Sequence, residues 1–439
     1  MTRRRRTSVM ARGGALLLAL ALLAAACGPQ PLEEDEEASA PEDDEEVALT
    51  WATISDEGHQ QVAERWNERN PDRQVEMVVL PPTADAQFQQ LVEDHVTETG
   101  AFDVMSLDVI WTAEFAEAGY IESLEDLRAD VEDVAIPSAL ETATWEGELW
   151  TAPYSTNFGM LYYRTDLVDE PPQTWDELFT MAADIAAEHE DVGGFAAQGD
   201  NYEGFVVNFL ELFWSAGGEV LTEDGTTSAF AEGDAAERAL EWMSEAFEEE
   251  VYVPGITSMI EDEGLGVFKA GEAAFMRNWP YALPILLEDE ESEVSDVVDI
   301  APLPTFDGEG TMSALGGINL AVSSLTDEAE AARDFVEWAA TDREAQELLA
   351  EFQPPPTMAE LYEDYEDVVP EELHDIYSVL NETREHARAR PPLPGYTGFS
   401  AAVQDELHPV YAGTADLQEA IDAVDEAVED ALGLEADTS

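Results

Sequence analysis

The sequence has few of the residues that build covalent or metal-bound sites. It contains a single cysteine, Cys27, and six histidines at positions 59, 95, 189, 374, 386 and 408. One cysteine excludes an intrachain disulfide and a cysteine-rich metal site. The histidines do not follow a metal-ligand spacing. We therefore expect neither a metal nor a cofactor.

Positive charge is also scarce. Lys and Arg number 18 against 99 Asp and Glu, which gives a formal net charge of −81, and Lys269 is the one lysine. Such a chain lacks the basic surface that binds nucleic acid or strongly anionic ligands. Its self-repulsion disfavours a compact state in dilute buffer, but the Debye length falls to about 3 Å at 1 M salt. The composition therefore predicts adaptation to high salinity.

The N-terminus has a cluster of arginines followed by an apolar run. Residues 3–6 are RRRR, Arg12 follows, and residues 15–26 are all Ala or Leu. This is the basic and then apolar pattern of an export signal. The run is too short to span a bilayer, which needs about 20 residues. We predict a signal peptide over residues 1–26.

Cys27 follows this run directly, in the stretch LLAAACGPQ. The stretch resembles the lipobox of bacterial lipoproteins, in which the signal is cut before the cysteine and the thiol is diacylated. Ala24 stands where that pattern usually has Leu, and a plain secretory signal is the alternative. The resemblance implies that Cys27 is a lipid attachment point. Residues 28–46, rich in acids and proline, predict a disordered tether, so that 27–46 links lipid and body.

The body begins with alternating strand and helix patterns. Strand-like segments at 47–54, 74–80 and 102–110 alternate with helical ones at 57–71 and 88–96, which predicts an α/β layer with a parallel sheet. Thr174 and Glu177 form a capping-box pattern for a helix within 171–189. Further expected elements are helix-rich stretches at 235–250 and 328–352 and a strand at 297–304.

An ordered set of strings then carries a family resemblance. DVMSLDVIWTAEFAEAGYIESL, APYSTNFGMLYYRTDL, PPQTWDEL, NYEGFVVNFLELFWSAGG, AFMRNWPYA, LGGINLAVSS and ARPPLPGY occur in this order. The chain, from 47 to about 432, resembles the extracellular solute-binding proteins of ABC sugar importers, within them the trehalose/maltose-binding branch. The resemblance implies an α/β, two-lobed periplasmic-binding-protein-like fold of type II, with a hinge and an interlobe ligand cleft.

The same resemblance implies where the lobes lie. The N-terminal lobe would hold residues 47–152 plus 307–351, and the C-terminal lobe 153–306 plus 352–432, followed by a tail at 433–439. The hinge crossings would lie near Tyr154, Phe306 and Gln353.

The implied function is that of a lipid-anchored receptor on the extracytoplasmic face of the cell membrane. It would capture a neutral sugar, a disaccharide such as trehalose or maltose, by lobe closure and deliver it to the transmembrane subunits of an ABC permease. We expect a monomer that does not bind nucleic acid. The alternatives are a secreted glycoside hydrolase, since paired carboxylates also hydrolyse sugars, and another surface carbohydrate-binding protein. The chain lacks HExxH, GxSxG and P-loop motifs, which argues against an enzyme.

A neutral sugar needs hydrogen-bonding groups for its hydroxyls and aromatic rings for its C–H faces. Asp108 ends a predicted strand, at the sheet edge where ligands of α/β proteins bind, although it could instead cap a helix from Ile110. By resemblance, Arg390 forks onto sugar hydroxyls, with Arg388 as its rival and a surface salt bridge as the alternative. Asn157 lies at the first crossing, where the resemblance implies a polar side chain that contacts sugar. Its alternative role is that of a turn residue.

Trp279 and Tyr281 are the expected stacking rings, because two positions on an extended segment face the same side; without the resemblance they would be core residues. The other expected contacts, some with alternative roles, are Asp56 and Glu57, one of which caps a helix; Tyr202 and Glu203, which otherwise begin a helix; and Gly317, where backbone approaches ligand closely. Ile318 stands where the family often has Trp.

Overall fold

The computed structural model describes residues 47–189, 191–352 and 354–433. The predicted signal peptide at 1–26, Cys27, the tether at 27–46, the hinge residue Gln353 and nearly all of the tail at 433–439 lie outside the described residues. Among the described residues, the helices are all too short or too polar to cross a membrane.

The first part of the chain forms the predicted parallel layer. Strand β1 (Val47–Thr53) pairs in parallel with β2 (Arg73–Val79) and β3 (Val104–Asp108). Helices α1 (Glu57–Arg69) and α2 (Ala84–Val96) connect them. The alternating pattern at the start of the body is thus confirmed.

Later segments extend this layer into a six-stranded mixed sheet. Strand β11 (Ser313–Val322) runs antiparallel to β3 and to β6 (Ala152–Phe158), and parallel to β12 (Ala387–Ala389). The strand order is β12-β11-β3-β1-β2, with β6 beside β11. Strand β12 comes from the segment 352–432 that the resemblance assigns to the other lobe, and the lobe bounds stay a prediction.

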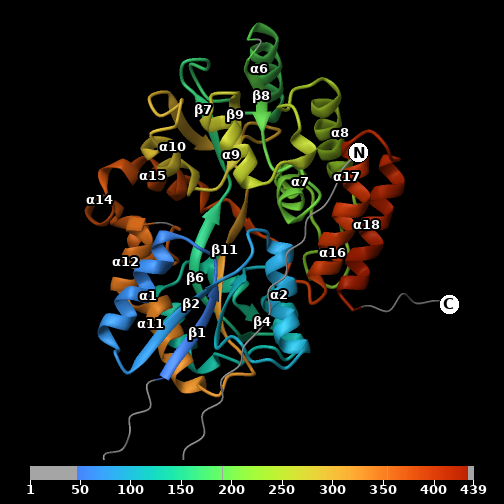
Figure 1. Ribbon diagram of the computed structural model, residues 1–439. Coiled ribbons are helices and arrows are strands. Elements are labelled where there is room, and N and C mark those ends of the chain that lie inside the picture. The colour runs from blue at the N-terminus through green and yellow to red at the C-terminus, as the bar shows by residue number, and fades with distance from the viewer. Residues whose placement is uncertain (1–46, 190, 353, 434–439) are drawn as a thin grey trace, which may run out of the picture. The chain divides into compact units, whose positions relative to one another are not determined.

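A second sheet has four strands in the order β10-β7-β9-β8. These are β7 (Met160–Arg164), β8 (Gly193–Ala196), β9 (Ala273–Asn278) and β10 (Val298–Pro302). The chain passes from the larger sheet to this one at Gly159, between β6 and β7, and returns between β10 and β11 (Figure 1). Strand β10 confirms the predicted strand at 297–304.

Local signals also place the helices. Helix α6 (Trp175–Glu188) begins with the capping box of Thr174 and Glu177, as predicted. The stretch 235–250 forms α8 (Ala235–Glu248), and 328–352 forms two helices, α11 (Ala329–Thr341) and α12 (Arg343–Phe352), separated by Asp342. The remaining helices are α3 (Thr112–Glu117), α4 (Arg128–Val134), α5 (Pro137–Thr142), α7 (Glu203–Ser215), α9 (Glu261–Lys269), α10 (Ala282–Glu288), α13 (Ala359–Glu363), α14 (Tyr365–Val368), α15 (His374–Thr383), α16 (Tyr396–Ala402), α17 (His408–Tyr411) and α18 (Leu417–Ala431); β4 (Thr144–Trp145) and β5 (Glu148–Leu149) form a small hairpin.

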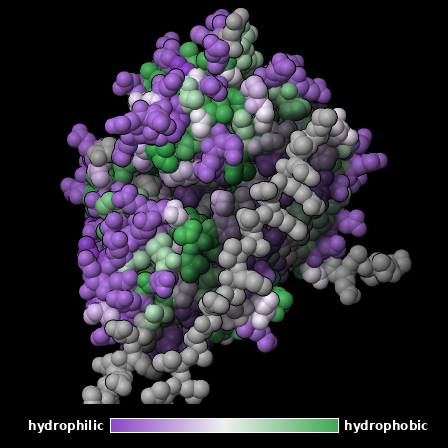
Figure 2. All heavy atoms as spheres, in the orientation of Figure 1, coloured by the Kyte–Doolittle hydropathy of each residue, from purple (hydrophilic) through white to green (hydrophobic). Residues whose placement is uncertain are grey.

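Hydrophobic clusters lie on both faces of the larger sheet. Leu49 and Trp51 of β1 pack with Val62 of α1 and Phe335 of α11 in one hydrophobic cluster, whereas Ala52 faces a second, larger cluster. Alternate residues of a strand point to opposite faces, so a strand covered on both sides, such as β1 (VALTWAT), is mostly apolar. The visible surface outside this core is mainly hydrophilic (Figure 2).

Candidate functional site

Strand β11 brings two of the predicted site residues together. Gly316 pairs with Asn157 on β6, and Ile318 pairs with Asp108 on β3. The backbone N–H of Val109 donates to the carbonyl oxygen of Gly317 at 3.3 Å. The end of β3 and the end of β6 therefore meet on either side of three consecutive β11 residues.

Gly317 has a structural reason to be glycine. Its φ is +128°, a conformation that side chains disfavour, and a Cβ there would collide with the carbonyl oxygen of Ser155. The backbone that closely approaches Gly317 is therefore that of β6. The expected contact between Gly317 and a ligand stays a prediction.

A buried ion-pair cluster joins Asp108 to two more predicted residues. Arg390, which follows β12, donates to Asp108 Oδ1 at 2.8 Å and to Glu203 Oε1 at 2.6 Å. Glu203 opens α7 and also accepts from the hydroxyls of Tyr396 and Ser400. The Arg390 side chain is 2% exposed. The rival Arg388 instead pairs with the exposed Glu219. Arg390 is thus the arginine of this ion-pair cluster, and which of the two contacts sugar stays a prediction.

Asp108 also accepts from the backbone N–H of Ile110 at 3.2 Å. The carboxylate makes this turn contact together with the ion pair to Arg390. It is not the helix N-cap considered as its alternative role, because the N-cap of α3 is Trp111. Helix α3 itself begins at Thr112.

The electrostatics of the cluster follow from burial. Burial raises the pKa of Glu203, against the lowering effect of Arg390. Burial alone would lower the pKa of Arg390, but the negative charge of Asp108 and contacts with Tyr396 and Glu203 raise it overall. The guanidinium is therefore charged and shared by two carboxylates. Such a site can both donate to and accept from hydroxyl groups.

A second group of predicted residues surrounds Trp279. The indole lies against Gly316: a Cβ on that glycine would be 3.2 Å from Trp279 Cη2. Trp279 Nε1 points to Glu261 Oε1 at 3.4 Å, and the Tyr202 hydroxyl donates to Glu261 Oε2 at 2.7 Å. Burial, and then the charge of Glu261, raise the pKa of Tyr281, which places that ring near the same carboxylate.

The assumption of an extended segment from Trp279 to Tyr281 is wrong. Strand β9 ends at Asn278, and the N–H of Ala282 donates to the Trp279 carbonyl in a turn. Tyr281 has helical backbone angles at the start of α10. Pro280 between them fixes its own φ near −65° and cannot donate to a strand, which favours the turn. The alternation of side chains along a strand therefore does not place these two rings on the same side.

Asp56 and Glu57 separate as expected, one of them capping a helix. Asp56 is the N-cap of α1 and accepts from the backbone N–H of His59 at 2.7 Å. Glu57 is exposed in the first turn. Neither contacts the Arg390 cluster through a described hydrogen bond or ion pair.

Glu261 and Arg277 both contact Trp279, and neither is among the predicted site residues. Glu261 is one of 99 acids, and Arg277 stands inside a strand whose side chains are all buried. Arg277 lies within AFMRNWPYA, one of the strings that carry the family resemblance, but the resemblance assigns it no role.

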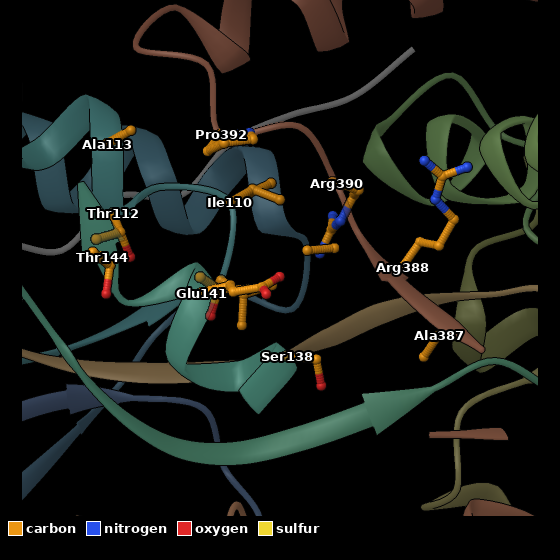
Figure 3. A pocket seen from close by; sticks show the side chains of 13 residues that line it. Ile110, Thr112, Ala113, Ser138, Glu141, Thr144, Ala387, Arg388, Arg390 and Pro392 are labelled. Atoms are coloured by element: carbon orange, nitrogen blue, oxygen red, sulfur yellow. The ribbon is translucent and has the colours of Figure 1, made fainter. Parts of the chain in front are cut away.

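Two hollows flank the ion-pair cluster. One, of about 360 Å³, is lined by Arg390 together with Ser138 and Glu141 of α5 (Figure 3). The other, of about 480 Å³, is lined by Glu203 together with Asp85 of α2, and Ile110 lines both. Both volumes lie in the usual range for small-molecule sites.

The chain matches the family described as bacterial extracellular solute-binding protein over residues 52–346. It belongs to this family. A probable ABC transporter-binding protein of Deinococcus radiodurans is 29% identical over 342 residues, covering 75% of this chain and 79% of the relative. A mannitol-binding protein of Pseudomonas aeruginosa is 26% identical, over 72% and 74% of the two chains.

Solved structures of other proteins confirm the periplasmic-binding-protein-like α/β fold. The maltose-bound MalE3 of T. maritima is similar to this solute-binding protein with a TM-score of 0.78 and 30% identity, covering 87% of this chain and 99% of that one. The GacH receptor of Streptomyces glaucescens has a TM-score of 0.77 at 23% identity, over 88% and 98% of the chains.

In this solute-binding protein, further carboxylates connect elements near the larger hollow, which Asp85 and Thr397 line. Glu114 of α3 accepts from the Thr397 hydroxyl at 2.8 Å and from its N–H at 3.3 Å, at the start of α16. Asp85 of α2 accepts from the N–H of Glu203 at 3.4 Å. Burial raises the pKa of both Asp85 and Glu114.

Proposed function

We propose that this protein is the sugar-capturing receptor of an ABC importer, and that its ligand is a neutral disaccharide such as trehalose or maltose. The observation that carries this is the similarity to a maltose-bound protein over 99% of that protein's length. The mannitol-binding relative also supports a polyhydroxylated ligand.

The proposed contacts follow the chemistry of the site. Asp108 accepts hydroxyl protons and Arg390 donates to hydroxyl oxygens, while Trp279 stacks on a C–H face. Asn157 lies beside Trp279, because both flank Gly316. Tyr202, Glu203, Tyr281, Gly317 and Asp56 or Glu57 complete the proposed set.

Capture in this proposal ends with closure of the two lobes. The cross-element contacts of Asp108, Glu114 and Asp85 support this, since each joins a side chain beside the larger sheet to the segments that begin at Glu203, Arg390 or Thr397. Closure would expel water and strengthen every hydrogen bond to the sugar.

Ile318 bears on which sugar is bound. It stands where the family often has Trp, and it is 9% exposed in a hydrophobic cluster. The stacking surface that a Trp would add is missing, so Trp279 and Tyr281 carry the stacking in this proposal.

The proposal includes a membrane anchor and a partner. Lipid on Cys27 and the tether at 27–46 would hold the monomeric receptor at the extracytoplasmic face of the membrane, beside the transmembrane subunits of the permease. The family's description as extracellular supports this side of the membrane.

A calorimetric titration in molar salt tests the ligand, with trehalose, maltose, sucrose and mannitol as the panel. We expect saturable binding of one disaccharide, with mannitol weaker. The sugar should be recovered unchanged by chromatography after long incubation. Heat changes absent for every panel sugar would refute the ligand class, and hydrolysis products would favour a glycoside hydrolase.

A further inference from the structure

Arg277 covers one face of the Trp279 ring. Arg277 lies in β9, and Trp279 comes two positions later, just after the strand ends. The guanidinium carbon of Arg277 lies 4.0 Å from the centroid of the Trp279 ring. Among aromatic side chains, the indole of Trp gives the most favourable cation–π contact. One of the two faces of this ring is therefore already occupied by the protein.

Arg277 is itself fixed in place. Its Nε donates to Glu211 Oε2 at 3.0 Å and its Nη2 to Glu211 Oε1 at 2.6 Å, while Nη1 donates to Gln198 Oε1 at 3.3 Å. Both side chains of the ion pair are 1% exposed. A bidentate arginine–carboxylate pair sets the plane of the guanidinium as well as its position.

The ion pair also contacts both segments in which the chain passes between the two sheets, one between β6 and β7 and the other between β10 and β11. Glu211 Oε1 accepts from the backbone N–H of Ala314, near the start of β11, at 3.1 Å. At the other crossing, a Cβ on Gly159 would collide with the carboxylate of Glu211 and the guanidinium of Arg277. Glycine at position 159 is thus required by the ion pair.

Stability alone does not account for this arrangement. Desolvating two charges costs as much as their attraction returns, and apolar residues of similar volume often do as well or better. What apolar residues would lack is a planar cation held over the face of the indole. The ion pair is therefore suited to orienting the ring.

We propose that Arg277, held by Glu211, is a positioning residue that fixes Trp279 as a one-sided stacking platform, with the opposite ring face left for sugar. This inference rests on the proposed function for the identity of the ligand. Glu261, beside the indole N–H, contacts the edge of the same ring.

The first experiment needs no ligand. Arg277→Met is combined with Glu211→Leu, so that neither charge is left buried alone. The Trp279 emission is obtained as the difference between each protein and its Trp279→Phe version. Arg238→Met is the matched control, because it removes a similar contact, 4.1 Å over Phe306, away from Trp279. In the double variant we expect the Trp279 emission to shift to the red and to be quenched more readily. In the control we expect the Trp279 emission to match that of the parent. Unchanged Trp279 emission in a folded double variant would overturn the proposal.

The second experiment is a double-mutant cycle on binding, measured with maltose and trehalose. With Trp279 present, the Arg277/Glu211 replacement should weaken sugar binding about 3- to 30-fold. With Trp279→Ala, the same replacement should change it by less than about 2-fold, because the two act as one unit. Equal losses in both backgrounds would contradict a role through Trp279. If Trp279→Ala alone leaves binding unchanged, the proposed ligand contact fails, while the emission measurement still decides whether Arg277 positions the ring.

Discussion

At the scale of single residues, the site combines charges and rings that are separated widely along the chain. Asp108 and Arg390 are 282 positions apart and form a hydrogen-bonded ion pair. Trp279 lies against Gly316 of β11, whose neighbour Gly317 accepts the N–H of Val109, next to Asp108. The two groups thus neighbour the same short stretch of β11, Gly316 to Ile318.

Trp279→Ala removes the proposed stacking face. We expect a sugar affinity about 10- to 150-fold lower, corresponding to about 1.5–3 kcal/mol of lost contact. The ring is only partly buried, so the melting temperature without sugar should change little. Trp338→Ala, a partly buried ring on α11 away from this site, is the control and should bind like the parent. A severe loss of stability in Trp279→Ala would mean that the ring is core packing.

Asp108→Asn keeps the shape of the side chain and removes its charge. Hydrogen bonds to charged groups contribute about 1.5–3 kcal/mol, so we expect affinity for the sugar to fall about 10-fold or more by calorimetry. Glu219→Gln makes the same kind of change at the exposed ion pair with Arg388 and should leave affinity unchanged. Parent-like binding by Asp108→Asn would remove this residue from the site.

At the scale of elements, α3 and α16 meet through Glu114 and Thr397. Glu114 accepts both the hydroxyl and the N–H of Thr397. Helix α16 continues through Val403–Leu407 into α17, so this one carboxylate contacts the start of a longer helical segment. Because burial disfavours the charged form, the contact depends on pH.

Glu114→Gln should change how stability depends on pH. Burial raises the pKa of Glu114 above its ordinary value of 4.5. Between the ordinary and the raised value the folded state binds more protons than the unfolded chain, so the free energy of unfolding falls as pH rises through that interval. Urea unfolding at several pH values from 4 upward should show a shallower fall in the variant. Parallel curves for parent and variant would contradict the assignment.

At the scale of the whole molecule, charge dominates. Five of the 18 basic residues precede Cys27 and all 99 acids follow it, so the part after the predicted signal has 13 basic residues. Many described arginines pair with carboxylates, such as Arg69 with Glu344 and Arg333 with Asp126. Exposed pairs of this kind contribute little and cannot offset the excess of acids.

Salt should therefore stabilise the fold. We expect the melting temperature to rise steeply from dilute buffer to molar KCl or NaCl, because shorter Debye lengths screen repulsion between carboxylates. Calorimetry at constant pH measures this. A flat dependence would refute adaptation to high salinity.

Cys27→Ser tests the proposed anchor. The variant should fold and bind sugar like the parent but appear in the medium, since the hydroxyl cannot take the thioether-linked lipid. Membrane fractionation and mass spectrometry of the mature N-terminus distinguish the two outcomes. A serine variant that stays with the membrane would contradict lipid attachment at Cys27.

Sequence alone determined the features that local spacing controls. The parallel layer from β1 to β3 follows from alternating periods, and the Thr174–Glu177 capping box needs only four residues. The ordered family strings also indicated the fold correctly. Tertiary structure decided which of 99 acids meet which cations: Glu203 and Asp108 share Arg390, Asp56 caps α1, and Glu261 lies beside Trp279. It also decided the turn at Pro280 and the contact that requires Gly317 to be glycine. The physical reason is that spacing reports the period of one element, whereas ion pairs and close backbone contacts depend on which elements become neighbours.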